Sequence, residues 1–201
     1  MQDYIVKFEL ASPILFNRNY EHDDDPEVEK REGEEKDKDA YERRTWRHRA
    51  HLDTNKEAII PAIWFRNMLR EAAPYRNDKV PGSRGGATYT KHFDAGILVL
   101  EPVRTGVKVE NLERVAMFVP ADGKHGSGRR VWKFFPQVSK LTASFRVTVL
   151  DETISQEVLE RHVYTGGNFI GIGSRRPRRG GEFGRLRIGI ALPGIEPGFS
   201  D

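Results

Sequence analysis

The chain has 201 residues, 37% hydrophobic and 31% charged, which suits one domain with a modest core and much solvated surface. It contains no cysteine, which excludes disulfides and thiolate metal sites. The first residues do not have the pattern of a signal peptide and no apolar run is near the ~18 residues of a membrane span, so we expect a soluble, cytoplasmic protein. The net charge of +3 is unevenly spread, because residues 21–44 hold twelve acidic and six basic side chains, a net of −6 that leaves +9 elsewhere and favours a polyanionic partner.

The first 57 residues predict one strand followed by a charged excursion. Residues 4–16 are apolar with partial alternation, and Ser12-Pro13 would end this strand. Residues 17–57 have almost no aliphatic side chain, which predicts a flexible insertion or, in part, a charged helix from about Asp37 onward. We expect residues 21–44 to be largely disordered and the insertion to supply no packed core.

The middle of the chain predicts a helix, a loop and a strand. Residues 59–73 repeat apolar side chains at helical spacing behind Pro61, which suits a first helical turn, and this helix should stop near Pro74. The glycine-rich residues 80–93 predict a loop, and the apolar residues 93–103 predict a strand.

The last part of the chain predicts strands around a second helix. Two β-rich runs within 110–138 flank the turn sequence ADGKHGSGRR and predict a hairpin. The clean alternation of residues 139–151 predicts a strand. A helix over 153–165 should begin at Thr153 and end at Gly166-Gly167, followed by strands over 168–173 and 183–192.

These elements predict a single α+β domain over residues 1–201. When the insertion at 17–57 and the hairpin region at 104–138 are set aside, the order approaches βαββαβ, which is the ferredoxin-like, RRM-like arrangement. The charged insertion then follows the first strand, and the hairpin is an insertion within the core.

A glycine- and arginine-rich stretch near the C-terminus is the strongest functional signal. Residues 165–192 hold eight glycines and six arginines with one acidic residue. Glycines let the main chain approach a phosphate closely, and arginine forks grip phosphate at two points. The alternative is a solvated basic turn, but the concentration of both residue types favours a nucleic-acid contact.

Two stretches resemble the RAMP superfamily of CRISPR-associated proteins. In EAIIPAIWFRNMLREA, the pair Ile60-Pro61 precedes a helix that reaches Leu69-Arg70, as in the superfamily's first helix. The sequence GGNFIGIGSRRPRRGGEFGRLRI is similar to its C-terminal glycine-rich signature, although Glu182 interrupts the usual Gly-Phe. The resemblance covers residues 4–16, 59–73 and 139–190.

The resemblance implies a backbone (Cas-seven-type) subunit, an RRM-like module that coats guide RNA by head-to-tail oligomerisation. In such subunits a β-hairpin thumb kinks the RNA, and residues 110–138 are where a thumb would lie. We therefore expect a non-catalytic subunit of a CRISPR-type ribonucleoprotein complex in antiviral defence. Its partners would be CRISPR RNA, other copies of itself and other effector-complex subunits, with no cofactor.

The candidate nucleic-acid-binding residues come from three places. The helix over 59–73 carries two arginines four residues apart, which could instead pair with the acidic segment. The run KHGSGRRVWKFF interleaves basic and aromatic residues, as expected of a surface that stacks single-stranded bases, although Trp132 or Phe134 could equally belong to the core. The full set is Arg66, Arg70, Lys124, His125, Arg129, Arg130, Lys133, Gly171, Gly173, Arg175, Arg176, Arg178, Arg179 and Arg185.

The sequence assigns neither a catalytic residue nor a metal site, but other functions stay open. His48 and His51 lie near Asp53, yet no further metal ligand is evident. Asp23, Asp24 and Asp25 occupy the loop in which some backbone subunits carry a catalytic aspartate, but an acidic run is usually solvated. The alternatives are a single-stranded DNA-binding protein of a phage or mobile element, a RAMP-type endoribonuclease, and an assembly protein that binds an acidic partner.

Overall fold

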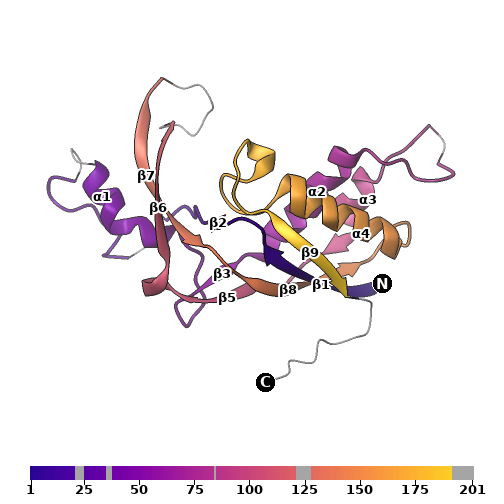
Figure 1. The fold of residues 1–201 in the computed structure, drawn as a ribbon, viewed down its shortest axis with the longest axis horizontal. Coiled ribbons are helices and arrows are strands. Elements are labelled where there is room, and N and C mark those ends of the chain that lie inside the picture. Colours follow the sequence, from indigo (N-terminus) through magenta and orange to yellow (C-terminus); the bar gives the residue numbers. More distant parts are fainter. Residues whose placement is uncertain (21–24, 35–37, 84, 121–127, 192–201) are drawn as a thin grey trace.

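The computed structural model describes residues 1–20, 25–34, 38–83, 85–120 and 128–191 (Figure 1). Four strands form its main sheet in the order β4-β8-β1-β9, and every neighbouring pair is antiparallel. These strands are β1 (Gln2–Leu10), β4 (Ile97–Leu98), β8 (Thr142–Val149) and β9 (Leu186–Ala191). No helix within the described ranges is long and apolar enough to cross a membrane.

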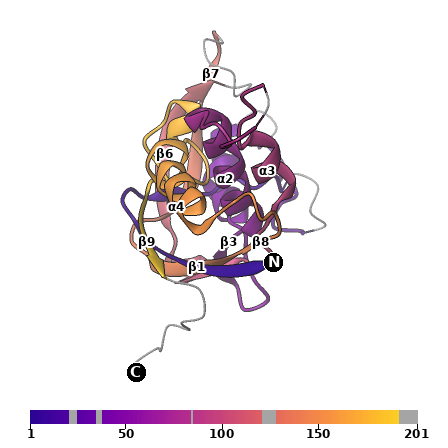
Figure 2. The ribbon, with the colours of Figure 1, turned by 90° about the vertical axis from the view of Figure 1, so that its right-hand side faces the viewer.

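Two helices, α2 (Ala62–Arg76) and α4 (Gln156–Thr165), cover one face of this sheet (Figure 2). The alternation in β1 turns Tyr4, Val6, Phe8 and Leu10 toward them. Phe65 of α2 stacks on Phe145 of β8 with ring centroids 4.2 Å apart and lies 5.5 Å from Phe8. The core therefore forms where the helices meet the sheet, and the chain runs through it as β1, α2, β4, β8, α4 and β9. The expected α+β class is confirmed.

A second sheet of three strands, in the order β2-β7-β6, carries the long hairpin. Its strands are β2 (Ile14–Leu15), β6 (Glu113–Pro120) and β7 (Arg130–Val138), and the expected hairpin is thus confirmed. Figure 1 shows the hairpin projecting from the body of the molecule. The remaining strands, β3 (Glu57–Ile60) and β5 (Val103–Lys108), pair with each other, and a short 3-10 turn, η2 (Val109–Asn111), follows them.

The expected strand over 93–103 is wrong for most of its length, because residues 97–98 form a strand, residues 99–102 do not, and Val103 begins β5. Residues Thr90–Ala95 form helix α3, which ends at Gly96, whose backbone N–H donates to the carbonyl of His92 at 2.7 Å. Only β4 remains as a strand before the chain leaves the sheet. Phe93 belongs to α3 and is buried in the core. The short apolar run is therefore divided between a helix, α3, and a strand, β4, and does not form one strand.

Helix α2 also continues past its expected end. Pro74 lies inside the helix, which ends at Arg76 with Asn77 in the left-handed conformation as its cap. Pro74 is exposed, so the backbone hydrogen bond that it cannot donate is missing on the solvent side.

The expected start and end of the second helix differ as well. Helix α4 begins at Gln156, with the Ser155 hydroxyl accepting from the N–H of Val158 at 3.3 Å, and not at Thr153. Gly166 and Gly167 do not end it, because the chain continues as a π-helical turn, η3 (Gly166–Ile170). The expected strand over 168–173 is therefore absent from the described structure.

The charged insertion contributes to the core, contrary to expectation. It contains helix α1 (Lys38–Thr45), near the charged helix expected from Asp37, and the 3-10 turn η1 (Trp46–Arg49). The side chains of Tyr20, Val28, Trp46 and Ala50 are all at most 5% exposed. Composition hid this packing, because aromatic residues anchor the segment where aliphatic residues are scarce. Residues 21–24 and 35–37 lie outside the described part.

Candidate nucleic-acid interface

A groove of about 760 Å³ runs between the hairpin and the arginine-rich turn. Figure 1 shows these two elements facing each other, with the turn in yellow beside β6 and β7. The residues that line the groove are Asn17, Met117, Phe118, Val119, Pro120, Arg130, Lys133, Phe135, Gly173, Ser174, Arg175, Arg176 and Arg179. Two segments separated by about forty residues of sequence therefore build one concave surface.

The groove is strongly basic. Arg130, Lys133, Arg175, Arg176 and Arg179 line it, and its described lining includes no acidic side chain. Lys133, Arg175 and Arg179 form no ion pair with any residue in the described ranges. Concentrated positive charge on low-dielectric walls raises the local concentration of anions, so this surface is suited to phosphate groups.

The arginine-rich turn is held to the core by its backbone. Its short helix η4 (Pro177–Arg179) closes through the N–H of Gly180, which donates to Pro177 at 2.9 Å. The N–H of Ser174 donates to the carbonyl of Leu15 at 2.9 Å, and that of Gly184 donates to Pro13 at 2.8 Å. Residues 13–15, which include strand β2, therefore fix both ends of the turn.

The glycines of this stretch are required by contacts within the chain itself. Gly171 and Gly173 have φ angles of 70° and 78°, which side-chain-bearing residues rarely adopt. A Cβ at Gly173 would lie 2.8 Å from the carbonyl oxygen of Leu15, and one at Gly171 would lie 2.6 Å from Pro177. Gly173 also lines the groove, whereas Gly171 is buried.

Several of the candidate arginines are engaged by other groups. Arg176, although it lines the groove, pairs with Glu71 of α2 at 2.6 Å and is only 13% exposed. Arg185 donates to the carbonyl of Asn168. Arg70 pairs with Asp94 of α3 at 2.8 Å. Arg66 donates to the carbonyl of that same residue at 3.1 Å, so these two candidate arginines of α2 bind α3 and not the described part of the acidic segment.

The hairpin carries Phe118, Trp132 and Phe134 on one face and Phe135 on the other. Phe134 is buried, and Trp132 is 47% exposed beside Phe118, with ring centroids 5.4 Å apart. Arg130 stands 5.4 Å above the ring of Phe118 and donates to its carbonyl. The alternating register places Lys133 on the face opposite Trp132.

The remaining candidates fall outside the groove lining. Arg129 and Arg178 are exposed but do not line it, and Lys124 and His125 lie outside the described residues. Sequence reasoning missed Asn17 and the apolar lining residues Met117 and Phe135. The alternation of β6 and β7 would have placed the last two on the face of Lys133, but no sequence signal says which face of a hairpin meets the body of the fold.

The outer face of the four-stranded sheet is not a stacking surface. Its described positions on β1 and β8 include Asp3, Lys7, Glu9 and Arg146, and none of its described positions is aromatic. Arg146 pairs with Asp3 at 3.5 Å, and Arg187 of β9 pairs with Glu9 at 3.1 Å. Base stacking on this face, the mode used by RRM sheets, has no aromatic partner here.

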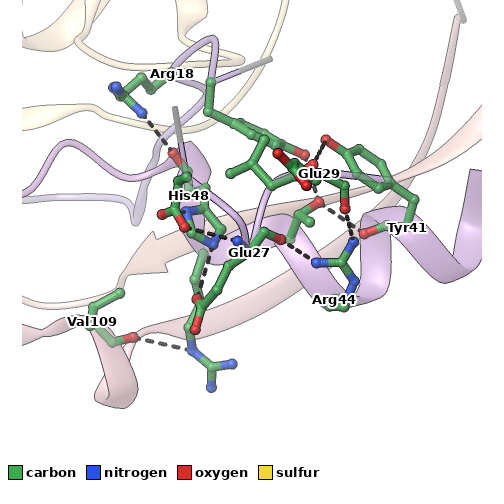
Figure 3. Close-up of polar contacts among 12 residues, drawn as sticks. Arg18, Glu27, Glu29, Tyr41, Arg44, His48 and Val109 are labelled. Atoms are coloured by element: carbon green, nitrogen blue, oxygen red, sulfur yellow. Dashed lines mark hydrogen bonds and ion pairs between the residues drawn. The ribbon is translucent and has the colours of Figure 1, made fainter. Parts of the chain in front are cut away.

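The acidic segment is held against α1 by polar contacts (Figure 3), and Figure 1 shows α1 on the side of the hairpin away from the arginine-rich turn. Arg44 binds both carboxylate oxygens of Glu34, at 3.0 and 2.8 Å, and donates to the carbonyls of Glu27 and Glu29. The Tyr41 hydroxyl donates to the carbonyl of Val28 at 3.0 Å. One arginine thus holds a ten-residue loop against one helix.

The two histidines next to this segment, His48 and His51, contact carboxylates and an aromatic ring of the chain itself. His48 lies 3.7 Å from Asp25 and 3.6 Å from Glu27. His51 packs edge-on against Trp64 with ring centroids 5.4 Å apart, and its burial lowers its pKa. Over the described ranges, no group of three or more His, Asp or Glu side chains could hold a metal ion. Asp23 and Asp24 lie outside those ranges.

No protein-family model and no curated protein matches this sequence. Among solved structures, the fold is similar to the crystal structure of Cmr6 from Pyrococcus furiosus, with a TM-score of 0.46 and 15% identity over 92% of this chain and 97% of that one. A chain of a CRISPR RNA-guided surveillance complex has a TM-score of 0.31 and 12% identity, and the match covers 81% of this chain and 58% of that one.

Proposed function

We propose that this chain is a non-catalytic subunit that binds single-stranded RNA by its phosphate backbone in the groove between the hairpin and the arginine-rich turn. The observation that carries the proposal is the groove itself, which five basic residues line and whose described lining includes no acidic residue. Arginine and lysine that neutralise phosphates release counterions, which supplies affinity without regard to sequence.

The apolar part of the groove supports a single strand over a duplex. Met117, Val119 and Phe135 lie on the same hairpin face as Lys133. Unpaired bases expose apolar faces that such side chains can cover, whereas the bases of a duplex are stacked on one another. The strand would therefore lie with phosphates toward the turn and bases toward the hairpin.

The proposed biological setting is a CRISPR-type ribonucleoprotein complex, in which copies of the chain coat guide RNA head to tail. This part of the proposal is supported by the motif resemblance around Ile60-Pro61 and the glycine-rich stretch. The other effector subunits would be its protein partners. The hairpin, which projects from the body of the molecule (Figure 1), would act as the thumb and would contact a neighbouring copy.

The direct test removes the three groove cations that form no ion pair with a described residue. In the variant Lys133→Gln/Arg175→Gln/Arg179→Gln, we expect weaker binding to every single strand and a log-affinity against log-salt slope that is shallower by up to about 2, at about 0.7 per lost phosphate contact. Arg176 is left in place because its pair with Glu71 is structural. Fluorescence anisotropy at several salt concentrations measures both quantities.

The matched control is Lys7→Gln/Arg146→Gln/Arg187→Gln, which removes the same charge from the outer face of the sheet. If both triple variants lose affinity equally, net charge and not the groove explains binding, and the proposed site is wrong. Competition between RNA and DNA strands of one sequence tests the choice of RNA, because only RNA has 2′-hydroxyls. Equal affinity for both would mean that binding does not use the 2′-hydroxyl, and tighter binding of DNA would favour a single-stranded DNA-binding protein.

A further inference from the structure

An exposed pair of aromatic rings lies at the end of α2. Tyr75, in the last turns of this helix, and Phe169, in the π-helical turn η3, are each 49% exposed. Their ring centroids are 5.7 Å apart and their planes differ by 20°, so the rings are stacked. Phenylalanine is usually buried, and half of this ring is in solvent although a large core lies next to it.

The π-helical turn explains why Phe169 points outward. Gly166 and Gly167 are buried against Met68 and Ile188, so the turn is pressed into the core from its glycine side. The side chain of Asn168 donates to the carbonyl of Tyr164 at 3.1 Å, and the carbonyl of Asn168 accepts from Arg185. These contacts fix the backbone on both sides of the ring. Such π-helical turns are frequent at functional sites.

The ring pair adjoins the arginine-rich turn. Glu71 lies one helical turn before Tyr75 on α2, and its carboxylate holds Arg176, which lines the groove. The turn η3, which carries Phe169, also contacts η4, which carries Arg178 and Arg179. A strand that leaves the groove past these arginines would run toward the turn that carries Phe169.

The chemistry of the pair fits a nucleobase. Two rings held nearly parallel present a flat apolar face, which every base can stack on, and neighbouring cations attract the phosphate that precedes or follows that base. The other exposed pair, Phe118 and Trp132, is tilted by 46° and has Arg130 over Phe118. The outer face of the main sheet has no aromatic residue at its described positions.

We propose that Tyr75 and Phe169 form a stacking platform for one base of the bound single strand. This inference rests on the proposed function, because it assumes that phosphates occupy the groove. It adds a second, uncharged contribution to binding, which is independent of salt.

The test uses an oligouridine strand with a single 2-aminopurine, moved along the strand from one molecule to the next, because stacking on an aromatic ring quenches its fluorescence. In the variants Tyr75→Leu and Phe169→Leu, which keep apolar bulk but lose the flat ring, we expect affinity about ten-fold lower, an unchanged salt slope and loss of quenching at one position. Tyr75→Phe should keep both affinity and quenching. A strand of the same length without bases should bind the wild type and the leucine variants alike.

Leu100→Ala, which shortens a side chain that is 75% exposed, is the matched control for loss of surface apolar area. Wild-type affinity and quenching in both leucine variants would overturn the platform. Equal weakening for the strand with bases and the strand without them would also overturn it. If the groove variant loses salt-dependent binding while the leucine variants lose nothing, the proposed function stands and only this inference is wrong. If the wild type binds no single strand at low salt, both are wrong.

Discussion

The arginines of the glycine-rich stretch have different tasks, although the sequence presents them as one cluster. Arg176 and Arg187 are paired with carboxylates, whereas Arg175, Arg178 and Arg179 form no ion pair within the described chain. The carboxylate that holds Arg176 is that of Glu71, 105 residues away in sequence. Residue type thus predicted a basic site, but only the fold could say which charges are free for a ligand.

For the glycines too, residue type alone did not reveal which contacts they make. Conformational freedom was expected to serve a ligand, and at Gly173 it also serves the close approach of Leu15. We predict that Gly173→Ala lowers the free energy of unfolding by about 1–3 kcal/mol more than Gly180→Ala does, because the new Cβ must displace a backbone carbonyl. Chemical denaturation measures both values.

Gly180 is the matched control because its φ of 74° is nearly that of Gly173, yet a Cβ there would meet nothing within 4 Å. Both substitutions therefore carry the same backbone strain of roughly 1–2 kcal/mol. Equal losses of stability would contradict the packing explanation. If Gly173→Ala is as stable as Gly180→Ala but binds nucleic acid poorly, the glycine is needed for the close approach of the ligand and not for packing.

At the scale of elements, periodicity was reliable where a segment is long and one-sided. The alternation of residues 139–151 correctly predicted the strand β8, and the helical spacing of residues 59–73 correctly predicted the helix α2. The short apolar runs at 93–103 and 168–173 did not, because a few apolar residues in a row fit a buried helix as well as a strand. The packing of the charged insertion was missed because it depends on single aromatic anchors such as Trp46.

Arg44 allows a direct test of how that insertion is held. Its hydrogen bonds to Glu34 lower the pKa of this carboxyl to about 2. A lowered pKa means that the pair stabilises the folded loop above the ordinary pKa of about 4.3 and that this stabilisation is lost as pH falls through about 2. We therefore expect residues 25–34 to stay docked at pH 5 and to detach only in strong acid.

The variant Arg44→Ala should move the Glu34 titration, followed by the ¹³C shift of its carboxyl, from near pH 2 to near pH 4. It should also open residues 25–34 to a glutamate-specific protease at neutral pH. Arg43→Ala is the control, since this neighbouring arginine is exposed. A loop that stays resistant without Arg44 would mean that the hydrogen bond from Tyr41 to the Val28 carbonyl and the burial of Val28 are enough to hold it.

At the scale of the whole molecule, the hairpin separates an acidic region from a basic one. In Figure 1 the hairpin lies between α1, with its acidic loop, and the arginine-rich turn. The uneven charge along the sequence had indicated two regions of opposite sign, and the fold places them on opposite sides of a projecting element. A molecule with unlike sides suits a head-to-tail contact, which does not close on itself.

We predict that the chain assembles along a single strand in steps of one 23.0 kDa subunit as the strand is lengthened. Each added copy gains the phosphate contacts of its own groove and a contact with the copy before it, so that long strands should fill cooperatively. Mass photometry on a series of strand lengths measures the steps. Reversing charge at Glu29 and Glu32, both exposed, should weaken filling of long strands while leaving binding to a one-subunit strand unchanged. A constant monomer, or a closed dimer at every length, would rule out assembly along the strand and leave the groove as the site of a protein that binds nucleic acid alone.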